Sequence, residues 1–191
     1  MNAAAEIEIR YSTLRDIPEL TRLIALCWRV HNFPYLNERF IASRRGRYGK
    51  AEVFVKHLMR QFIVARIDGR IVAYSEMQRR FRLFGLETGF VGQLYVHPDL
   101  CRRGIGTRLF SMVRALFYSE GQPDIFLSCL AMNLRSRSFY ERQGGIEFLG
   151  GLSGPDFIAV PIVYYGFGPA CEAKWLEIAG SADTPASRHL L

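Results

Sequence analysis

The stretch 91-VGQLYVHPDLCRRGIGTRLFSMVRALF-117 joins an alternating apolar segment to a basic glycine loop and then to an amphipathic segment. Residues 88–96 alternate between two faces, which predicts a strand. His97-Pro98-Asp99 ends that strand, because proline cannot continue a hydrogen-bonded ladder. The apolar residues that follow recur at helical spacing and predict a helix over residues 103–118, whose start lies inside the glycine loop.

The glycine loop has the features of an anion-binding site. Gly104 and Gly106 lack a Cβ atom, so the backbone can turn tightly and a ligand can approach it closely. The first N–H groups of the following helix have no intrahelical partner, and the helix dipole favours negative charge there. Arg102 and Arg103 add positive charge. This combination predicts a pyrophosphate site, although a plain strand-to-helix turn with basic caps would have the same local sequence.

Two common phosphate-binding patterns do not fit the chain. The Walker pattern is absent, because Lys50 follows Gly49 without an earlier glycine at the required spacing. The dinucleotide-binding pattern also fails, since Leu109 occupies the position of its third glycine. The ligand therefore has to be identified from the rest of the sequence.

Composition is typical of a globular protein with one domain. The chain has 191 residues, of which 49% are hydrophobic, enough for a full core. The formal net charge of +7 favours an anionic partner, such as nucleic acid, an anionic membrane surface or a phosphorylated cofactor. We expect a single domain over residues 1–178 and a loose polar tail over residues 179–191.

Cysteine usage and the N-terminal sequence predict a cytoplasmic protein. The four cysteines lie far apart without CxxC spacing, which argues against a zinc site and a disulfide framework and favours reduced thiols. Glu6 and Glu8 stand where a secretory signal would be apolar. That cysteine spacing leads us to expect no metal. No apolar run has the length of a membrane span, so we expect no membrane association.

Local patterns predict a mixed α/β sheet that is neither all-parallel nor a sandwich. Asp68-Gly69 separates two β-rich runs, which is the signal of a tight hairpin. Thr13 has the chemistry of an N-cap, and Pro161 would confine the last β-rich segment to a sheet edge or a bulge. The other expected strands are residues 6–11, 88–96, 125–130 and one or two within 155–167, and the expected helices are 14–30, 51–60, 103–118 and 134–143.

The glycine loop and its flanking residues resemble a family motif. LYVHPDLCRRGIGTRLF (94–110) is similar to the acetyl-CoA-binding motif of the GNAT N-acetyltransferase superfamily, (Q/R)xxGx(G/A). Gly104 and Gly106 fill its glycine positions, whereas Cys101 stands where glutamine or arginine is usual. This departure is tolerable, because the family contacts the pyrophosphate largely through backbone amides.

A second segment, NLRSRSFYERQGG (133–145), resembles the family's NxxAxxxYExxGF pattern. Four positions match it: Asn133, Tyr140, Glu141 and Gly144. Ser136 replaces the alanine, and Gly145 replaces the aromatic residue. The two segments have the family's order and spacing, and together with the preceding hairpin the resemblance covers residues 6–165.

The resemblance implies the GNAT acyl-CoA N-acyltransferase fold, an α/β structure with a central, mostly antiparallel sheet flanked by helices. Two parallel strands, here 88–96 and 125–130, splay apart, and the pantetheine of acetyl-CoA lies in the gap. The backbone groups expected to pair with it as a missing strand would are those of Leu94, Tyr95 and Val96. The residues expected around the pyrophosphate are Arg102, Arg103, Gly104, Ile105, Gly106 and Thr107, with Asn133 and Tyr140 near the thiol.

The same resemblance implies direct transfer of an acetyl group from the co-substrate acetyl-CoA to an amine. The Val96 amide would face the thioester carbonyl and act as an oxyanion donor. Tyr140 would protonate the thiolate leaving group, whereas the residue taken alone would be read as packing a helix face.

The sequence identifies no single residue as the base that deprotonates the acceptor. Some family members carry a glutamate at a position that corresponds to about Ser128 here, so the usual carboxylate is missing. Glu76 and Glu87 on neighbouring strands, or His97 acting through a water, are candidates, and each also fits an ordinary polar residue. Gln93 could orient a water.

The acceptor site of the family is built mainly from the first helical region and the late strands. Here the first region contains a basic loop with Arg39, Arg44, Arg45, Arg47 and Lys50. This loop is either a solvated surface or a feature that repels polyamines and favours an acceptor with a carboxylate or phosphate. Aromatic residues that could line an apolar pocket, or belong to the core, are Phe33, Tyr35, Phe40 and Tyr48.

Three functions are therefore compared. The first is an acetyl-CoA-dependent N-acetyltransferase that acts on a primary amine of a small molecule or peptide. The second is a non-catalytic acyl-CoA-binding module, which the missing carboxylate and Cys101 keep open. Nucleic-acid binding has little support, because the aromatic residues do not interleave with the basic run. The identity of the acceptor, the length of the acyl group and a homodimer are left open.

Overall fold

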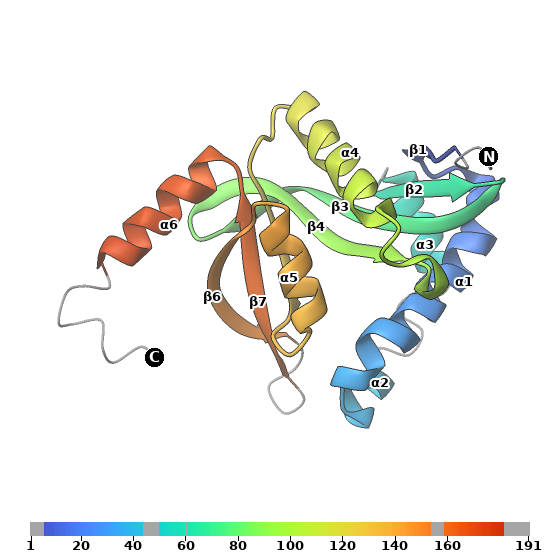
Figure 1. The fold of residues 1–191 in the computed structure, drawn as a ribbon, viewed down its shortest axis with the longest axis horizontal. Coiled ribbons are helices and arrows are strands. Elements are labelled where there is room, and N and C mark those ends of the chain that lie inside the picture. Colours follow the sequence, from blue (N-terminus) through green and yellow to red (C-terminus); the bar gives the residue numbers. More distant parts are fainter. Residues whose placement is uncertain (1–5, 44–49, 60, 154–158, 182–191) are drawn as a thin grey trace.

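One seven-stranded sheet organises the part of the chain that the computed structural model describes, residues 6–43, 50–59, 61–153 and 159–181 (Figure 1). Its strand order is β1-β2-β3-β4-β5-β7-β6. The strands are β1 (Glu8–Tyr11), β2 (Phe62–Ile67), β3 (Arg70–Leu83), β4 (Leu86–Val96), β5 (Ile125–Leu130), β6 (Ile146–Ser153) and β7 (Val160–Phe167). Among the described neighbours only β4 and β5 are parallel, which confirms the expected mixed α/β sheet.

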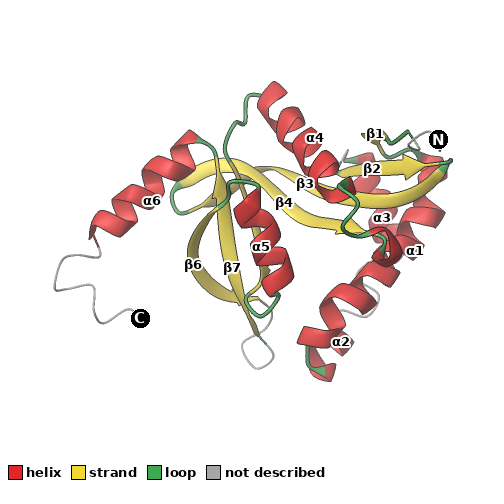
Figure 2. Cartoon of the chain, in the orientation of Figure 1, coloured by secondary structure: helices red, strands yellow, loops and turns green. Residues whose placement is uncertain are grey.

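Helices cover both faces of this sheet (Figure 2). They are α1 (Ile17–Cys27), α2 (Glu38–Ser43), α3 (Lys50–Leu58), α4 (Ile105–Ser119), α5 (Leu134–Arg142) and α6 (Pro169–Ser181). Short helical turns are η1 (Leu14–Asp16), η2 (Trp28–Asn32), η3 (Phe33–Tyr35) and η4 (Pro98–Leu100). α4 packs on one face of β2–β4, and α1 and α3 pack on the other.

Strict alternation in β2 produces the two layers. Ile63 and Ala65 are buried in the core that includes α4, whereas Phe62 and Val64 are buried in the core that includes α1. Successive side chains of a strand point to opposite faces, so a β-rich run without polar residues can serve both cores. This places the first four residues of β2, and the Ile71–Ser75 stretch of β3, in the interior of the molecule.

Two hairpins bring β4 to the centre of the sheet. The first confirms the sequence prediction, because Asp68 and Gly69 have φ angles of 49° and 74° and form a tight primed turn. The second, between β3 and β4, turns at Phe84 and Gly85 and was not predicted. Phenylalanine is unusual at a positive φ, here 51°, so the turn has a weak sequence signal.

A buried carboxylate fixes the start of α1. Thr13 caps η1 as predicted, while Asp16 occupies the N-cap of α1 itself. The Asp16 carboxylate is 1% exposed and accepts hydrogen bonds from Arg10, Arg66 and the Thr13 backbone, each at 2.6 Å. Burial alone would raise the pKa of Asp16, but the hydrogen bonds from Arg10 and Thr13 outweigh it and lower the pKa to about 2.

The C-terminal segment differs from expectation at Pro161. This residue does not confine β7 to an edge, because β7 lies between β5 and β6. Pro161 is the second residue of the strand and lies opposite Leu152 of β6, beyond the last residue of β5. The missing N–H therefore removes no bond to β5. Helix α6 continues to Ser181, into the segment expected as a loose tail, and residues 182–191 lie outside the described part.

Candidate active site

The site forms where β4 separates from β5. The two strands pair only at Gly89–Val91 against Ile125–Leu127. Beyond that point β4 remains paired with β3 up to Val96, and β5 remains paired with β7 up to Leu130. A parallel pair that stops while both strands continue leaves one side of each strand without a neighbouring strand.

The backbone of β4 directs hydrogen-bonding groups toward this opening. The N–H of His97 donates to the carbonyl of Val72 at 2.8 Å, and bonded pairs alternate along an antiparallel ladder. The ladder groups of Tyr95 therefore face β3, whereas those of Leu94 and Val96 face away from β3. Of the three backbones expected to pair with pantetheine, only Leu94 and Val96 have groups in the required direction.

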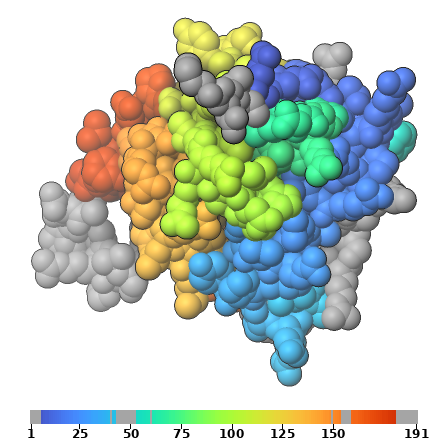
Figure 3. All heavy atoms as spheres, turned by 45° about the vertical axis from the view of Figure 1, so that its right-hand side comes forward, coloured from blue at the N-terminus to red at the C-terminus, as the bar shows by residue number. Residues whose placement is uncertain are grey.

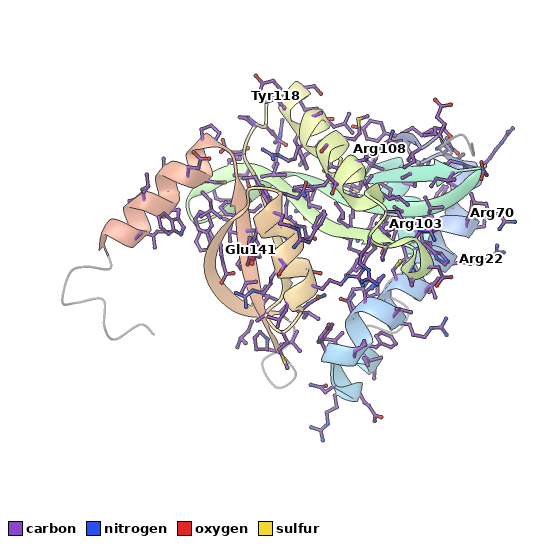
Figure 4. The ribbon with its side chains drawn as sticks, viewed as in Figure 1. Arg22, Arg70, Arg103, Arg108, Tyr118 and Glu141 are labelled. Carbon is purple, nitrogen blue, oxygen red and sulfur yellow. The ribbon has the colours of Figure 1, made fainter. Side chains whose placement is uncertain are left out.

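A cavity of about 620 Å³ lies at this end of β4. In Figure 3 the lime-green residues after β4 lie between the blue N-terminal third of the chain and the orange region of α5. The predicted site residues that line the cavity are Leu94, Tyr95, Val96, Arg102, Gly104, Gly106, Thr107, Asn133 and Tyr140. Ile105 is instead buried in the core, and the exposed Arg103 does not line the cavity, although it lies in the loop before α4 (Figure 4).

The glycine loop presents the start of α4 to the cavity. Gly104 is the N-cap of α4 and has a φ of +78°, a conformation that favours glycine. The first intrahelical bond runs from the N–H of Arg108 to Gly104, which leaves the N–H groups of residues 105–107 without a helical acceptor. A Cβ atom on Gly106 would meet Val96 at an ordinary 3.5 Å, so the protein itself does not require glycine there. The space in front of Gly106 suits a ligand's phosphate.

Two arginines of α5 were missed by the sequence reasoning. Arg135 and Arg142 line the same cavity as Arg102. They lie seven residues apart, which is two helical turns, and so share one face of α5. This spacing was readable in the motif NLRSRSFYERQGG, and it adds positive charge to a cavity that suits an anionic ligand.

A second cavity of about 200 Å³ shares a wall with the first. The residues that line both are Leu94, Tyr95, Asn133, Ser136 and Tyr140. Ser128 and Gln93 line the smaller cavity, together with residues of η2, β5 and β7. Its described lining includes no charged side chain. The two cavities thus meet at the motif residues Asn133 and Tyr140.

Tyr140 lies at this junction with its ring packed and its hydroxyl unused. The residue is 7% exposed, and its ring contacts Phe110, Phe139 and Tyr165. The described part of the chain supplies no hydrogen-bond partner to its hydroxyl. Burial raises the pKa of Tyr140 well above its ordinary value of 10, so the phenol is protonated at neutral pH. A protonated hydroxyl at the junction can donate a proton.

Gln93 is held by a buried network. Its Oε1 accepts hydrogen bonds from the Tyr74 hydroxyl at 2.7 Å and the Trp28 indole at 3.3 Å. Its Nε2 donates to Glu76 at 2.9 Å, and Glu76 also pairs with Lys56 at 2.7 Å. Glu76 thus has a partner for each oxygen and reaches the smaller cavity only through Gln93.

Other predicted candidates lie away from both cavities. Glu87 is exposed, in the part of β4 nearest the Phe84 turn. His97 lines neither cavity, and its Nδ1 accepts a hydrogen bond from the Asp99 backbone. Of the basic loop, Arg39 is exposed and lines neither cavity; Arg44, Arg45, Arg47 and Tyr48 lie outside the described residues, as do the side chains of Phe40 and Lys50. Tyr35 lines the larger cavity, whereas Phe33 does not.

The turn η2 contributes residues that the sequence reasoning missed. It is a π-helical turn, because the N–H that follows it bonds to the carbonyl of Trp28 five residues back. Trp28 reaches Gln93, and the side-chain amide of Asn32 donates to the Tyr95 hydroxyl at 2.7 Å. These contacts join segments more than sixty residues apart, so no local pattern could have indicated them.

A sheet that opens beside a glycine-capped helix terminus, with a polar cavity behind the opening, defines an acyl-CoA-dependent acyltransferase. The family model described as "Acetyltransferase (GNAT) family" matches residues 18–145, and the chain belongs to that family. Acetyl-CoA is its co-substrate. No curated protein matches the chain in sequence.

Solved structures support the fold. The PaiA N-acetyltransferase from Thermoplasma acidophilum, in complex with coenzyme A, is 18% identical, with a TM-score of 0.67 over 86% of this chain and 99% of that one. Ard1 from Thermoplasma volcanium is 15% identical, with a TM-score of 0.64 over 84% and 95%. The ribosomal-protein-S18-alanine N-acetyltransferase from Escherichia coli is 18% identical, with a TM-score of 0.58 over 85% and 94%. Among the described helices, none is both long and apolar enough to cross a membrane.

Proposed function

We propose that this chain is an N-acetyltransferase that moves an acetyl group directly from acetyl-CoA to a primary amine of a small molecule or peptide. The observation that carries the proposal is the meeting of two cavities of unequal size at Tyr140. The larger has an anion-binding end and suits acetyl-CoA, and the smaller is neutral and suits the amine. The cytoplasmic location and the homodimer considered from sequence stay predictions.

The chain's own groups can hold the co-substrate along the larger cavity. The free N–H groups of residues 105–107, together with Arg102, suit the pyrophosphate. Arg135 and Arg142 are placed to contact a further phosphate. The outward-facing N–H and C=O of Leu94 suit an amide of pantetheine, which then takes the place of a strand beside β4. The Val96 carbonyl already accepts a hydrogen bond from His31. Acetyl-CoA supplies the activated thioester.

Two groups are proposed to act on the reaction centre. The Val96 N–H faces away from β3 and suits the carbonyl oxygen on which charge develops. Tyr140 is protonated at neutral pH and is proposed to donate its proton to the departing sulfur. Both groups belong to rigid elements, β4 and α5, so their positions depend little on loop conformation.

The smaller cavity favours an amine whose neighbouring groups are small and uncharged. Its described polar lining consists of neutral amides, hydroxyls and a thiol, including Asn32, Gln93 and Ser128. An extra charge on the acceptor would be desolvated there without a described counter-charge. The amino group of a peptide that begins with a small residue fits these conditions. Of the two alternatives for the basic loop, a solvated surface and a feature that favours an acidic acceptor, the second receives no support from Arg39, which is exposed and lines neither cavity.

The first test measures the melting temperature with saturating acetyl-CoA. At one hundred times its dissociation constant, a ligand that binds only the folded state adds about 2.7 kcal/mol, which is about 5–11 °C for a chain of this size. The same protein is then incubated with acetyl-CoA and a panel of peptides beginning with Ala, Ser or Met, together with small primary amines, and released thiol is measured.

The two measurements separate the alternatives. Binding with acetylation of an amine supports the N-acetyltransferase. Binding with no amine acetylated would favour the non-catalytic acyl-CoA-binding module. No change in melting temperature would contradict the placement of acetyl-CoA in the larger cavity.

A further inference from the structure

His31 lies in the wall of the larger cavity, held by β4. Its Nε2 lies 3.2 Å from the carbonyl oxygen of Val96, and its ring stacks on Tyr95 with centroids 6.0 Å apart and planes 13° apart. A carbonyl oxygen can only accept a hydrogen bond, so Nε2 carries the proton of the neutral ring. The lone pair of the neutral ring is therefore on Nδ1.

The surroundings of His31 favour this neutral form. Burial is the main cause that lowers its pKa below the ordinary 6.5; the hydrogen bond to Val96 opposes it, and the charge of Arg135 on α5 adds to it. The other titratable or charged groups near the ring, or sharing its cavity, are Cys27 on α1, Cys101 and Arg102 in the glycine loop, Tyr95 on β4, Tyr35 on η3, and Tyr140 and Arg142 on α5. No carboxylate is among them within the described lining.

His31 differs from every other titratable group around the two cavities. The ordinary pKa of a tyrosine, cysteine or arginine lies well above neutrality, and only histidine exchanges a proton near pH 7 without a large shift. Among the described residues that line either cavity, His31 is the only histidine, and no aspartate or glutamate lines them. Its neighbour on the ring face, Tyr95, lines both cavities and marks their common wall.

We propose that His31 is the general base of the reaction, taking the proton of the acceptor ammonium through Nδ1 by way of water, because its ring lines the larger cavity and not the smaller one proposed for the amine. This inference rests on the proposed function and supplies the base for which the sequence offered Glu76, Glu87 and His97. It assigns the role to a residue of η2, so that the acid and the base come from different sides of the opening in the sheet.

With these two side chains, the protons and electrons of the reaction balance. His31 takes one proton from the ammonium, and the freed nitrogen lone pair forms a bond to the acetyl carbon. The carbon–sulfur bond breaks, its electron pair stays on sulfur, and Tyr140 gives the sulfur a proton. The second nitrogen proton returns to the Tyr140 oxygen, and His31 releases its proton to solvent, so one proton is released per acetyl group transferred.

The test uses His31→Gln in the full chain, with the acceptor that the wild type acetylates. Glutamine can keep an N–H donor toward Val96 and cannot act as a base at neutral pH. We expect kcat at pH 7.5 to fall by about 100-fold or more, with acetyl-CoA affinity within about 2-fold of wild type. The wild-type kcat should decline as the pH falls through a value below 6.5, because protonation removes the lone pair, and this limb should be absent in the variant.

The matched control is His57→Gln. His57 belongs to α3, where its ring hydrogen-bonds to the Ser12 side chain at 2.8 Å, and it lines neither cavity. This variant should therefore keep both the rate and the pH profile. His97→Gln tests the rival base, and a loss of the acidic limb there but not in His31→Gln would overturn the inference. Should His31→Gln lose acetyl-CoA binding, His31→Ala with added imidazole decides: recovery of rate supports the base, and no recovery in a folded protein contradicts it.

The outcomes distinguish this inference from the proposed function. If the wild type acetylates no amine, both the proposed function and the inference about His31 are contradicted. If the wild type is active and His31→Gln keeps the wild-type rate and the decline of kcat at low pH, only the inference about His31 is contradicted. Histidine resonances, assigned by comparing wild type with His31→Gln, give a readout independent of turnover, and His31 should titrate below 6.5.

Discussion

The two halves of β4 have the same neighbour on one side and different surroundings on the other. The first half ends in Gly89–Val91, which lie between β3 and β5 and pair with strands on both sides. The second half, Gly92–Val96, keeps β3 but is not paired with β5 on its other side, where the Val96 carbonyl contacts His31 of η2. The difference teaches that a site can be made by ending a strand pairing early. Changes in the first half should affect folding, and changes at the second half should affect binding and turnover.

The largest effect is expected at the junction of the two cavities. Tyr140→Phe keeps the ring contacts with Phe110, Phe139 and Tyr165 and removes only the proton donor. The turnover number should fall by about 100- to 10,000-fold, with the low end favoured because water can also deliver a proton. Acetyl-CoA affinity and melting temperature should stay close to wild type. Turnover at the wild-type rate would make Tyr140 a packing residue.

The second effect tests the free space beside the second half of β4. Gly106→Val should weaken acetyl-CoA binding by about 100-fold, because overpacking costs about 1–3 kcal/mol and the Cβ meets no tight protein contact. The melting temperature without ligand should change little. Gly180→Val in α6 is the matched control, a helical glycine with nothing nearby, and should leave the affinity unchanged. Equal affinity in both variants would show that the phosphates bind elsewhere.

The third effect belongs to the first half of β4. Gly89→Ala would place a Cβ 2.5 Å from the buried ring of Phe117, so the packing has to shift. Unfolding free energy should fall by about 2–3 kcal/mol, or about 2–4 °C in melting temperature for each kcal/mol. Acetyl-CoA affinity of the folded protein should be unchanged. Gly92→Ala in the second half, where the Cβ meets Glu76 at an ordinary contact distance of 3.4 Å, should be much milder, and equal losses would contradict the contrast between the two halves.

The smallest effect is expected from Asp16, whose loss should lower the stability of the whole fold without favouring either half of β4. The folded-state pKa of Asp16 is about 2 against an ordinary 3.8, so its contribution is present above pH 3.8 and is lost as the pH falls through 2. Asp16→Asn should lower the unfolding free energy at pH 7 by about 2 kcal/mol and flatten the acid limb of stability. Melting temperatures with and without acetyl-CoA should fall together. Glu8→Gln, a change of a carboxylate that is 59% exposed, should do little; an equal loss there would contradict the role of Asp16.

The sequence predicted the elements whose information is local. The strand at residues 125–130 was predicted to the residue, and the hairpin at Asp68-Gly69 and the helix after Gly104 were recognised from turn chemistry and periodicity. The mixed sheet followed from the order of these elements. In the site, the residues on the two motifs came together as the resemblance implied, except that Ile105 packs into the core and Arg103 lies outside the cavity.

The misses share a physical cause, which is contact across long stretches of chain. The Phe84 turn was hidden by a side chain that rarely adopts a positive φ. The prediction from Pro161 was wrong because a central strand can contain a proline at a position beyond the end of the neighbouring strand. The length of that neighbouring strand cannot be inferred from the residues around the proline. The contacts of His31 and Asn32 with Val96 and Tyr95 have no local sequence signal, because they depend on where β4 passes. Only Arg135 and Arg142 had a readable spacing that was overlooked.

The extra residue in the π-helical turn η2 has a consequence for chain length. Removing one residue from Trp28–Asn32 would restore ordinary helical winding and rotate every later side chain of the turn by about 100°. The buried face of α1 precedes the turn and would keep its packing, while the groups that reach Val96 and Tyr95 would point elsewhere. A single deletion would thus redirect the side chains that contact the end of β4 and leave the rest of the fold in place, a change that no single substitution reproduces.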